Sequence, residues 1–345
     1  MDFETAAVTG ATGHLGNVLV RELLARGKRV RAVVLPGDDQ RALQGLPVDV
    51  SPGDVTDRGS LTPPFRGADV VFHLAGIVSI SSLHARQVFE VNARGTENVV
   101  AACREAGVRR LVYTSSVHAL TEPAPDRVLD EKAGFDPARA VGAYGRAKAA
   151  ASAAVTAAAR DGLDAVLVLP TAVLGPFDYR LSEMGALICM FARGSLPAVV
   201  DGGYDFVDVR DVARGHVAAA SRGRSGESYL LTGGRLSVRE VMRVLAAEAG
   251  RPPPRLVVPL AVAAGIARLA PAFELLTGRR ALLTSYSVHT ISSRFRISDE
   301  KARRELGFTS MPVEDSLRDA WRWMNDDPGS PMRRPLPPSR PARTR

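Results

Sequence analysis

Short apolar runs alternate with segments of helical periodicity through the first half of the chain. Buried strands are predicted by the apolar runs at residues 6–9, 29–35, 48–50, 69–74, 110–115 and 165–169. Helices are predicted at residues 15–26, 85–106 and 142–160, each of which ends at or near a glycine. This alternation predicts an α/β fold with a doubly wound parallel sheet, the Rossmann arrangement.

The pattern is less regular after residue 175. Further helices are predicted at residues 181–192, 238–249, 298–306 and 313–324, with a strand at 229–231. We expect residues 1–175 to form a sheet domain that binds a dinucleotide, with residues 203–234 returning to it. Residues 176–202 and 235–327 would form a smaller, irregular C-terminal lobe that binds the substrate. The segment 328–345, rich in Pro and Arg, is predicted to be disordered.

The longest apolar stretch covers residues 256–269. Pro259 interrupts it and Arg268 lies near its end, so it is too short and too broken to span a bilayer. We expect a buried or pocket-covering helix here rather than a helix on a membrane surface. The acidic start of the chain predicts no signal peptide, and the spacing of Cys103 and Cys189 suggests no pairing. Both features favour a cytoplasmic location.

Positive charge is concentrated at the C-terminal end. The formal net charge is +8, and five arginines without any acid stand within residues 329–345. Because most of the excess belongs to this tail, we predict no nucleic-acid partner. The six histidines show no metal-ligand spacing, so no metal site is predicted either.

A glycine-rich turn follows the first predicted strand. Gly10, Gly13 and Gly16 stand three residues apart at the start of a helical segment. Glycines let backbone N–H groups approach a phosphate closely, and a helix N-terminus adds partial positive charge. The turn therefore indicates a seat for the pyrophosphate of a dinucleotide.

Tyr144 and Lys148 stand four residues apart at the start of the helix 142–160, so both project from one face. An ammonium close to a phenol is expected to lower the pKa of Tyr144 toward neutrality. Such a tyrosine can exchange a proton with a substrate oxygen while hydride moves at the adjacent carbon. At the end of the fifth strand, Ser115 or Ser116 would lie at the ligand-binding edge of the sheet and hold the same oxygen.

The glycine turn, the strand-end serine and the Tyr-x-x-x-Lys helix, in this order, resemble the short-chain dehydrogenase/reductase superfamily. The chain length and the second lobe are similar to its extended branch, the NAD-dependent epimerase/dehydratase family. Residues 169–177 and 206–213 are similar to segments of dihydroflavonol 4-reductase-like members. The resemblance implies an NAD(P)-dependent enzyme with a small-molecule substrate.

The resemblance also implies roles for individual residues. Ser116, Tyr144 and Lys148 would be catalytic, with Ser115 as the alternative serine, and Asn92 would brace its helix against the sheet. The substrate pocket would be walled by residues 78–83, 117–118, 173–179 and parts of 181–200, and residues 202–205 would shape its far side. The implied cofactor-binding residues are Gly10, Thr12, Gly13, His14, Leu15, Gly16, Leu35, Asp54, Val55, Leu74, Ala75, Gly76, Thr114, Tyr144, Lys148, Pro170 and Val173.

More than one reaction stays open. Leu169 stands before Pro170, where nucleotide-sugar enzymes more often carry an arginine. This favours a carbonyl reductase or alcohol dehydrogenase acting on a small, fairly apolar molecule. The alternative is a nucleotide-sugar epimerase or dehydratase with tightly bound NAD, and a minor one is a non-catalytic nucleotide-binding regulator.

The choice between NAD and NADP is left open by the sequence. Relatives that prefer NADPH place an arginine at the end of the second strand, where this chain has Leu35. Asp38 and Asp39 come a few residues too late to match the acid of NAD-binding relatives. In many relatives the helices that correspond to 85–106 and 142–160 form a dimer face, so the resemblance also points to a homodimer.

Overall fold

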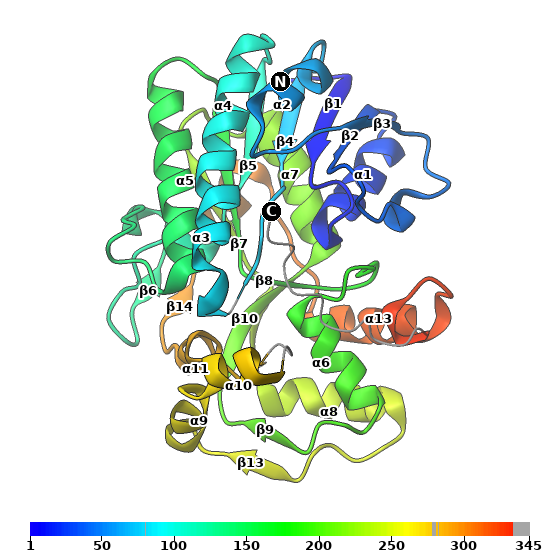
Figure 1. The fold of residues 1–345 in the computed structure, drawn as a ribbon, viewed down its shortest axis with the longest axis vertical. Helices are drawn as coiled ribbons and strands as arrows, with labels where there is room; N and C mark the ends of the chain where they lie inside the picture. Colours follow the sequence, from blue (N-terminus) through cyan, green and yellow to red (C-terminus); the bar gives the residue numbers. More distant parts are fainter. Residues whose placement is uncertain (80, 278–280, 282, 334–345) are drawn as a thin grey trace.

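The computed structural model describes residues 1–79, 81–277, 281 and 283–333 of the 345-residue chain. Seven strands form one parallel sheet: β1 (Thr5–Thr9), β2 (Arg29–Val34), β3 (Asp49–Pro52), β4 (Val70–His73), β5 (Arg110–Thr114), β7 (Ala165–Pro170) and β11 (Ser228–Leu231). Their order is β11-β7-β5-β4-β1-β2-β3 (Figure 1). The strand order reverses at β1, so the turn after β1 opens at the switch point of the sheet. The predicted doubly wound sheet is confirmed.

Alternate residues of the central strands pack on opposite faces of the sheet. The helices that cover it are α1 (His14–Ala25), α2 (Arg58–Phe65), α4 (Gly95–Glu105), α5 (Gly142–Arg160), α7 (Val209–Arg222) and α12 (Glu300–Leu306). Val71 and Leu111 face α2, α4 and α5, whereas Val70 and Val112 face α1, α7 and α12. Because both faces are covered, these strands are apolar throughout instead of alternating with polar residues.

The helix predicted at residues 85–106 is divided into three parts. α3 (Ala85–Phe89) continues into a π-helical segment, η3 (Glu90–Arg94), and then into α4. The prediction of one regular helix is therefore wrong. A π-helical turn holds an additional residue, and such turns are frequent at functional sites.

The remaining strands form smaller sheets. Their strands are β6 (Val128–Leu129), β8 (Ala172–Leu174), β9 (Ala198–Val200), β10 (Gly203–Asp208), β12 (Gly234–Ser237), β13 (Leu256–Val258) and β14 (Arg296–Ile297). β10 pairs with β8 and β12, β9 pairs with β13, and β6 pairs with β14. Within residues 203–234, α7 and β11 pack in the main sheet region while β10 belongs to a separate sheet.

The remaining helices lie mainly in the lower part of Figure 1. They are α6 (Glu183–Ala192), α8 (Val238–Ala249), α9 (Leu260–Ala267), α10 (Ala270–Thr277), α11 (Ser285–Ser292) and α13 (Val313–Asp326). Ser237 caps α8 in a capping box with Glu240, as the sequence predicts for this helix start. α12 begins at Glu300 rather than at the predicted residue 298.

The predicted disordered tail has an ordered beginning. Ser330 is buried and its hydroxyl donates to the carbonyl oxygen of Met324, while the Arg333 guanidinium donates to the carbonyl oxygen of Asn325. The expectation of disorder is therefore wrong for residues 328–333. Residues 334–345 lie outside the described part of the chain.

The apolar stretch 256–269 is not buried. Val262 and Ile266 of α9 are 53% and 51% exposed, so the alternative of a buried helix is wrong. No single helix among the described residues is long and apolar enough to cross a bilayer. α9 and α10 reach that length and composition only together, and they are bent by 46° relative to each other.

Candidate active site

The turn between β1 and α1 leaves no room for side chains at two of its glycines. A Cβ on Gly10, whose φ is +69°, would lie 2.7 Å from the backbone nitrogen of Ala75. A Cβ on Gly16 would overlap the carbonyl oxygen of Gly10. Gly13 is the N-cap of α1, and no side chain hydrogen-bonds the free N–H groups there. Free backbone N–H groups of this kind are the hydrogen-bond donors that bind a phosphate group at a helix N-terminus.

Thr9 holds the loop after β4 close to this turn. Its hydroxyl accepts hydrogen bonds from the backbone N–H groups of Leu74 and Ala75, each at 3.2 Å, and lies 2.8 Å from Nδ1 of His73. Nε2 of His73 lies 3.0 Å from the hydroxyl of Thr96. His73 is fully buried, and burial lowers its pKa to about 3. The segment predicted to line the cofactor is therefore fixed to β1.

Asn92, in the π-helical η3, fixes the other end of this loop. Its amide oxygen accepts from the N–H of Ile77 at 2.7 Å, and its amide nitrogen donates to the carbonyl of Ile77 at 2.8 Å. A Cβ on Gly76 would lie 2.9 Å from Oδ1 of Asn92 and 3.7 Å from Nζ of Lys148. The predicted bracing role of Asn92 is confirmed, and the braced loop runs beside Lys148.

Ser116, Tyr144 and Lys148 come together at the carboxyl end of β5. Tyr144 and Lys148 lie in the first two turns of α5, and all three side chains are buried. Nζ of Lys148 donates to the carbonyl oxygen of Thr114 at 2.7 Å and lies 4.9 Å from the ring centre of Tyr113. The hydroxyl of Thr114 is paired with Nε2 of His216 at 2.8 Å, so the backbone that receives Lys148 is itself fixed.

The neighbouring serine is engaged elsewhere. Oγ of Ser115 lies 2.6 Å from Oγ of Ser152 on α5, and Ser152 donates to the carbonyl oxygen of Lys148. Successive residues of extended chain point to opposite sides, so Ser116 is the serine that hydrogen-bonds Tyr144. The geometry favours Ser116 over Ser115.

Burial sets the protonation of the tyrosine and the lysine. Burial raises the pKa of Tyr144 to about 12, against a hydrogen bond with Ser116 that lowers it. Burial lowers the pKa of Lys148 to about 7. The predicted lowering of the Tyr144 pKa is therefore wrong for this structure, because the loss of water contact dominates. At neutral pH the Tyr144 phenol carries its proton.

Three aromatic side chains from different parts of the chain surround Tyr144. The His118 ring lies edge-on to Tyr144 at 6.3 Å, stacks on Tyr204 of β10 at 5.6 Å and lies 5.4 Å from Tyr286 of α11. Burial lowers the pKa of His118 to about 4, so this imidazole is neutral at pH 7. His118 and Tyr204 fall within the predicted pocket walls. Tyr286 was not anticipated, since nothing in the local pattern of α11 marks it.

Arg180, in the loop before α6, reaches back to the glycine turn. Its guanidinium donates to the Asp38 carboxylate at 2.6 Å and to the Thr12 hydroxyl at 3.1 Å, and Thr12 donates to Asp38 at 2.6 Å. Burial alone would raise the pKa of Asp38, but these hydrogen bonds outweigh it and hold the pKa below its usual value. Leu35 is half exposed. Asp38 comes too late in the sequence to match the acid of NAD-binding relatives, but the fold brings it next to the glycine turn.

The other predicted cofactor residues occupy varied settings. The Asp54 carboxylate accepts two hydrogen bonds from Thr56 in the turn after β3, and Val55 is buried in the core. Nε2 of His14 lies 2.9 Å from a loop carbonyl, and Leu15 lies in the first turn of α1. Pro170 ends β7 and Val173 belongs to β8. The roles of Asp54 and Val55 beside an adenine stay predictions.

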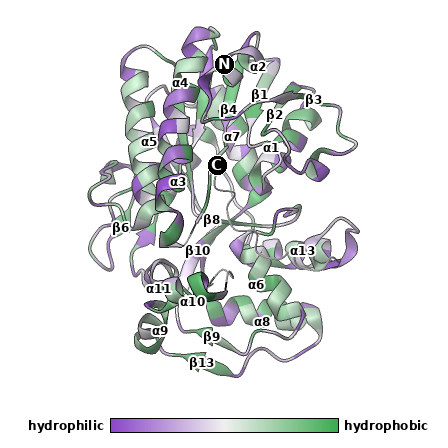
Figure 2. Cartoon of the chain, in the orientation of Figure 1, coloured by the Kyte–Doolittle hydropathy of each residue, from purple (hydrophilic) through white to green (hydrophobic). Residues whose placement is uncertain are grey.

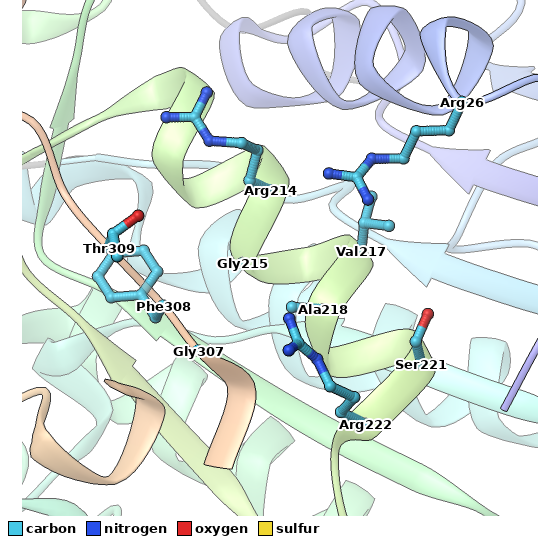
Figure 3. Close-up of a pocket in the computed structure, with 10 residues that line it drawn as sticks. All are labelled: Arg26, Arg214, Gly215, Val217, Ala218, Ser221, Arg222, Gly307, Phe308 and Thr309. Carbon is cyan, nitrogen blue, oxygen red and sulfur yellow. The ribbon is translucent and has the colours of Figure 1, made fainter. Parts of the chain in front are cut away.

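A cavity of about 370 Å³ lies away from these residues, between α1, α7 and residues 307–309 (Figure 3). Arg26, Arg214 and Arg222 line it, and the first two are paired with Glu22 and Asp211. It lies beside the C-terminal ends of α1 and α7, where the chain enters the strands. Ligands of doubly wound sheets bind at the opposite, carboxyl end of the strands, so this cavity is not part of the candidate site.

Comparison with known proteins agrees with this arrangement. Residues 6–232 match the NAD dependent epimerase/dehydratase family. Sterol demethylase protein B of Methylococcus capsulatus is 37% identical over 324 residues, which cover 93% of this chain and 98% of the relative. A Synechocystis protein named as a dihydroflavonol 4-reductase is 33% identical over 323 residues, covering 92% and 94%. The crystal structure of a nucleoside-diphosphate-sugar epimerase from Pseudomonas aeruginosa has a TM-score of 0.75 at 27% identity, covering 95% and 99%.

The fold and the site define an enzyme of the extended short-chain dehydrogenase/reductase class. The residues present fit a nicotinamide dinucleotide, because the glycine turn is clear of side chains and the N-terminus of α1 is uncapped. The chain belongs to the NAD-dependent epimerase/dehydratase family.

Proposed function

We propose that this enzyme is a carbonyl reductase or alcohol dehydrogenase that acts on a carbonyl/secondary-alcohol pair of a largely apolar ring compound. The observation that carries the proposal is the buried group of Ser116, Tyr144 and Lys148. Tyr144 keeps its proton at neutral pH, as a proton donor to a carbonyl oxygen must.

Each of these residues has a task at the substrate oxygen. When bound, the nicotinamide supplies or accepts the hydride. Tyr144 donates its proton to the carbonyl oxygen in reduction and takes it back in oxidation. Ser116 hydrogen-bonds the same oxygen and orients it. Lys148, one turn further along α5 and held by the carbonyl of Thr114, stabilises the negative charge that develops on the Tyr144 oxygen.

The surroundings of Tyr144 support an apolar substrate. His118 is neutral and, with Tyr204 and Tyr286, presents aromatic ring faces and edges. Aromatic walls pack well against flat or fused-ring molecules. Two relatives carry the names of a sterol-processing protein and a dihydroflavonol reductase, which both refer to multi-ring oxygenated compounds.

The alternative is a nucleotide-sugar epimerase or dehydratase, as the name of the Pseudomonas aeruginosa neighbour suggests. Such an enzyme needs free cations for the substrate diphosphate. Here Leu169 is fully buried, Arg180 is paired with Asp38, and Arg235 is paired with Asp205 and the carbonyl oxygen of Gly203. These pairings favour the reductase.

The cofactor in this proposal is NAD. Asp38 is ionised and held against the glycine turn, where an acidic side chain can accept a hydrogen bond from the adenosine ribose. The 2′-phosphate of NADP would be brought against the same carboxylate. Arg180, which could neutralise that phosphate, is occupied by Asp38.

Turnover assays test the reaction. The protein is mixed with NADH or NADPH and with a panel of ring ketones and nucleotide sugars, and nicotinamide absorbance and products are followed together. We expect loss of reduced nicotinamide in step with formation of a ring alcohol. Conversion of a nucleotide sugar without net change in the nicotinamide would contradict the proposal and favour the epimerase.

A matched pair of variants tests the assigned acid. Tyr144→Phe removes the proton donor and should lower kcat by about 10²–10⁴-fold, while cofactor binding measured by fluorescence titration is unchanged. Tyr286→Phe also removes a tyrosine hydroxyl, but from one of the aromatic side chains around Tyr144. This buried hydroxyl has no hydrogen-bond partner among the described residues. Tyr286→Phe should leave kcat within a few-fold of the original. Full activity in Tyr144→Phe would refute the mechanism.

A further inference from the structure

The helix pair α9–α10 buries small side chains and exposes several large apolar ones. Ala263, Ala267 and Ala270 point inward and are buried, where the first two pack with Val288 of α11. The larger apolar side chains point to solvent. This arrangement is the reverse of a surface helix in a globular protein, which buries its large apolar residues.

Five exposed apolar side chains of this helix pair make up what we call the apolar ridge. Val262 and Ile266 share one face of α9 and Phe273 and Leu276 share one face of α10, because they are spaced four and three residues apart, and Leu269 lies at the bend between the helices. In this order, their exposed fractions are 53%, 51%, 45%, 86% and 67%. Figure 2 shows the two helices largely in the hydrophobic colour. A patch of this kind marks an interaction site.

Positive charge borders the ridge. Arg268 stands at the bend between Ile266 and Leu269, and Arg255 precedes β13 in the same segment of the chain; both are exposed, and neither forms an ion pair with any described residue. Glu274, the one acid within α9 and α10, is turned away, since it accepts hydrogen bonds from Ser81 and from the backbone of Ala281. The ridge therefore presents apolar side chains with the unpaired Arg268 among them, the chemistry of a helix that lies in the interface of an anionic bilayer.

The ridge is also attached to the walls of the candidate active site. Ser81, which bonds Glu274, belongs to the loop that follows Gly76, and this loop exposes Val78 and Leu83. α11, on which α9 packs, carries Tyr286 beside the ring of His118. The ridge is thus linked to the candidate site through two elements, the loop that carries Ser81 and the helix α11 that carries Tyr286.

We infer that the apolar ridge docks this enzyme on the surface of a membrane that contains anionic phospholipid. The helices lie in the interface and do not cross the bilayer. A second copy of the chain fits less well, because a symmetric contact through the ridge would bring the unpaired Arg268 of both copies together. Docking also brings α11, which carries Tyr286 beside His118, close to the lipid, where an apolar substrate dissolves; this last step rests on the proposed function.

Vesicle flotation of the full-length protein tests the docking without any assay of activity. The probes are phosphatidylcholine vesicles with and without phosphatidylglycerol. We expect the protein to float with the anionic vesicles, and Leu269→Glu/Leu276→Glu to lower the bound fraction by about tenfold or more, since two leucines lose their apolar contact. Arg255→Gln/Arg268→Gln should abolish the preference for the anionic vesicles.

The control is Val50→Glu, which adds a charge at a similarly exposed apolar position on β3, far from the ridge. It should float as the unchanged protein does. Equal flotation of the Leu269/Leu276 variant would mean that the basic C-terminal segment binds the lipid, and would overturn the inference. So would a failure to float, or light scattering that shows a dimer dissolved by the ridge substitutions. Turnover of a water-soluble ketone is measured separately, and its absence would count against the proposed function alone.

Discussion

At the scale of single residues, Asp38 is the side chain that selects NAD over NADP in the proposed function. Asp38→Ala removes the carboxylate and releases the Arg180 guanidinium beside Thr12. A free guanidinium there attracts a 2′-phosphate. We expect the ratio of NADPH to NADH affinity to rise by about tenfold or more, the value of a charge-assisted hydrogen bond. Fluorescence titration of each cofactor measures it.

The double variant Asp38→Ala/Arg180→Ala serves as the control for this change. It removes both the Asp38 carboxylate that repels the 2′-phosphate and the Arg180 guanidinium that attracts it. The ratio of NADPH to NADH affinity should therefore rise only a few-fold. If both variants gained equally, Arg180 would have no part in cofactor choice. If the unchanged protein bound NADPH more tightly than NADH, the assignment of NAD would be wrong.

The candidate catalytic residues could be predicted from the sequence because their geometry is local. Tyr144 and Lys148 share a helix face by their spacing, and Ser116 ends a strand. Their protonation could not be predicted in this way. The pKa of Tyr144 depends on how much water the folded chain removes from it, and this is set by Tyr204 and Tyr286 from distant segments as much as by its own helix.

At the scale of secondary structure, the start of α5 is the contact between the catalytic helix and α11. Gly142 has a φ of +72°, and a Cβ there would lie 2.6 Å from the ring of Tyr286. Gly142→Ala should therefore push Tyr286 and α11 away from Tyr144. We expect KM for the ring substrate to rise several-fold, while the free energy of unfolding falls by about 1–2 kcal/mol through backbone strain.

Gly107→Ala introduces the same backbone strain without displacing Tyr286. Gly107 has a φ of +68°, and no atom lies within 4 Å of its built Cβ. This variant should lose about the same free energy of unfolding in denaturant titration, about 1–2 kcal/mol, with an unchanged KM. Equal KM values for both glycine variants would show that Tyr286 does not shape the substrate site.

The secondary structure was predictable to different degrees in the two halves of the chain. The central strands of the main sheet are buried on both faces and stand out as apolar runs, whereas the edge strand β3 is largely exposed. β6 and β14 have two residues each, too few for any periodicity. η3 was missed because one additional residue per turn leaves the helical spacing of its neighbours almost unchanged. α9 differs from the prediction of a buried helix because apolar content alone does not require burial.

At the scale of the whole molecule, three histidines with lowered pKa values make stability depend on pH: His73 and His216, which are buried, and His118, which is partly exposed. Burial lowers the pKa of His73 to about 3 and those of His118 and His216 to about 4, against 6.5 in the unfolded chain. Between pH 6.5 and 4 the unfolded chain therefore binds more protons than the folded one. Stability must rise with pH in this window, and fall on acidification.

Thermal unfolding measured from pH 7 to pH 4 checks this prediction. The Tm should fall steadily as the pH drops below about 6.5. His289 acts in the opposite sense, because the hydrogen bond that its ring donates to the Glu122 carboxylate raises its pKa. His216→Gln, which cannot gain a charge, should reduce the steepness of the fall. A Tm that is constant over this range would contradict the neutral state of the three imidazoles.

The hydrogen bonds around His73 have a direction that fixes where its proton resides. The Thr9 hydroxyl already accepts from two backbone N–H groups, so its own proton points to Nδ1 of His73. The Thr96 hydroxyl donates to the carbonyl oxygen of Asn92 at 2.7 Å, so it can only accept from Nε2. His73 is therefore held in the Nε2–H tautomer. The hydrogen bonds from the loop after β4, through Thr9 of β1 and His73 of β4, to Asn92 in the π-helical η3 therefore all donate in the same direction. A second proton on the His73 ring would reverse the hydrogen bond between Thr9 and His73.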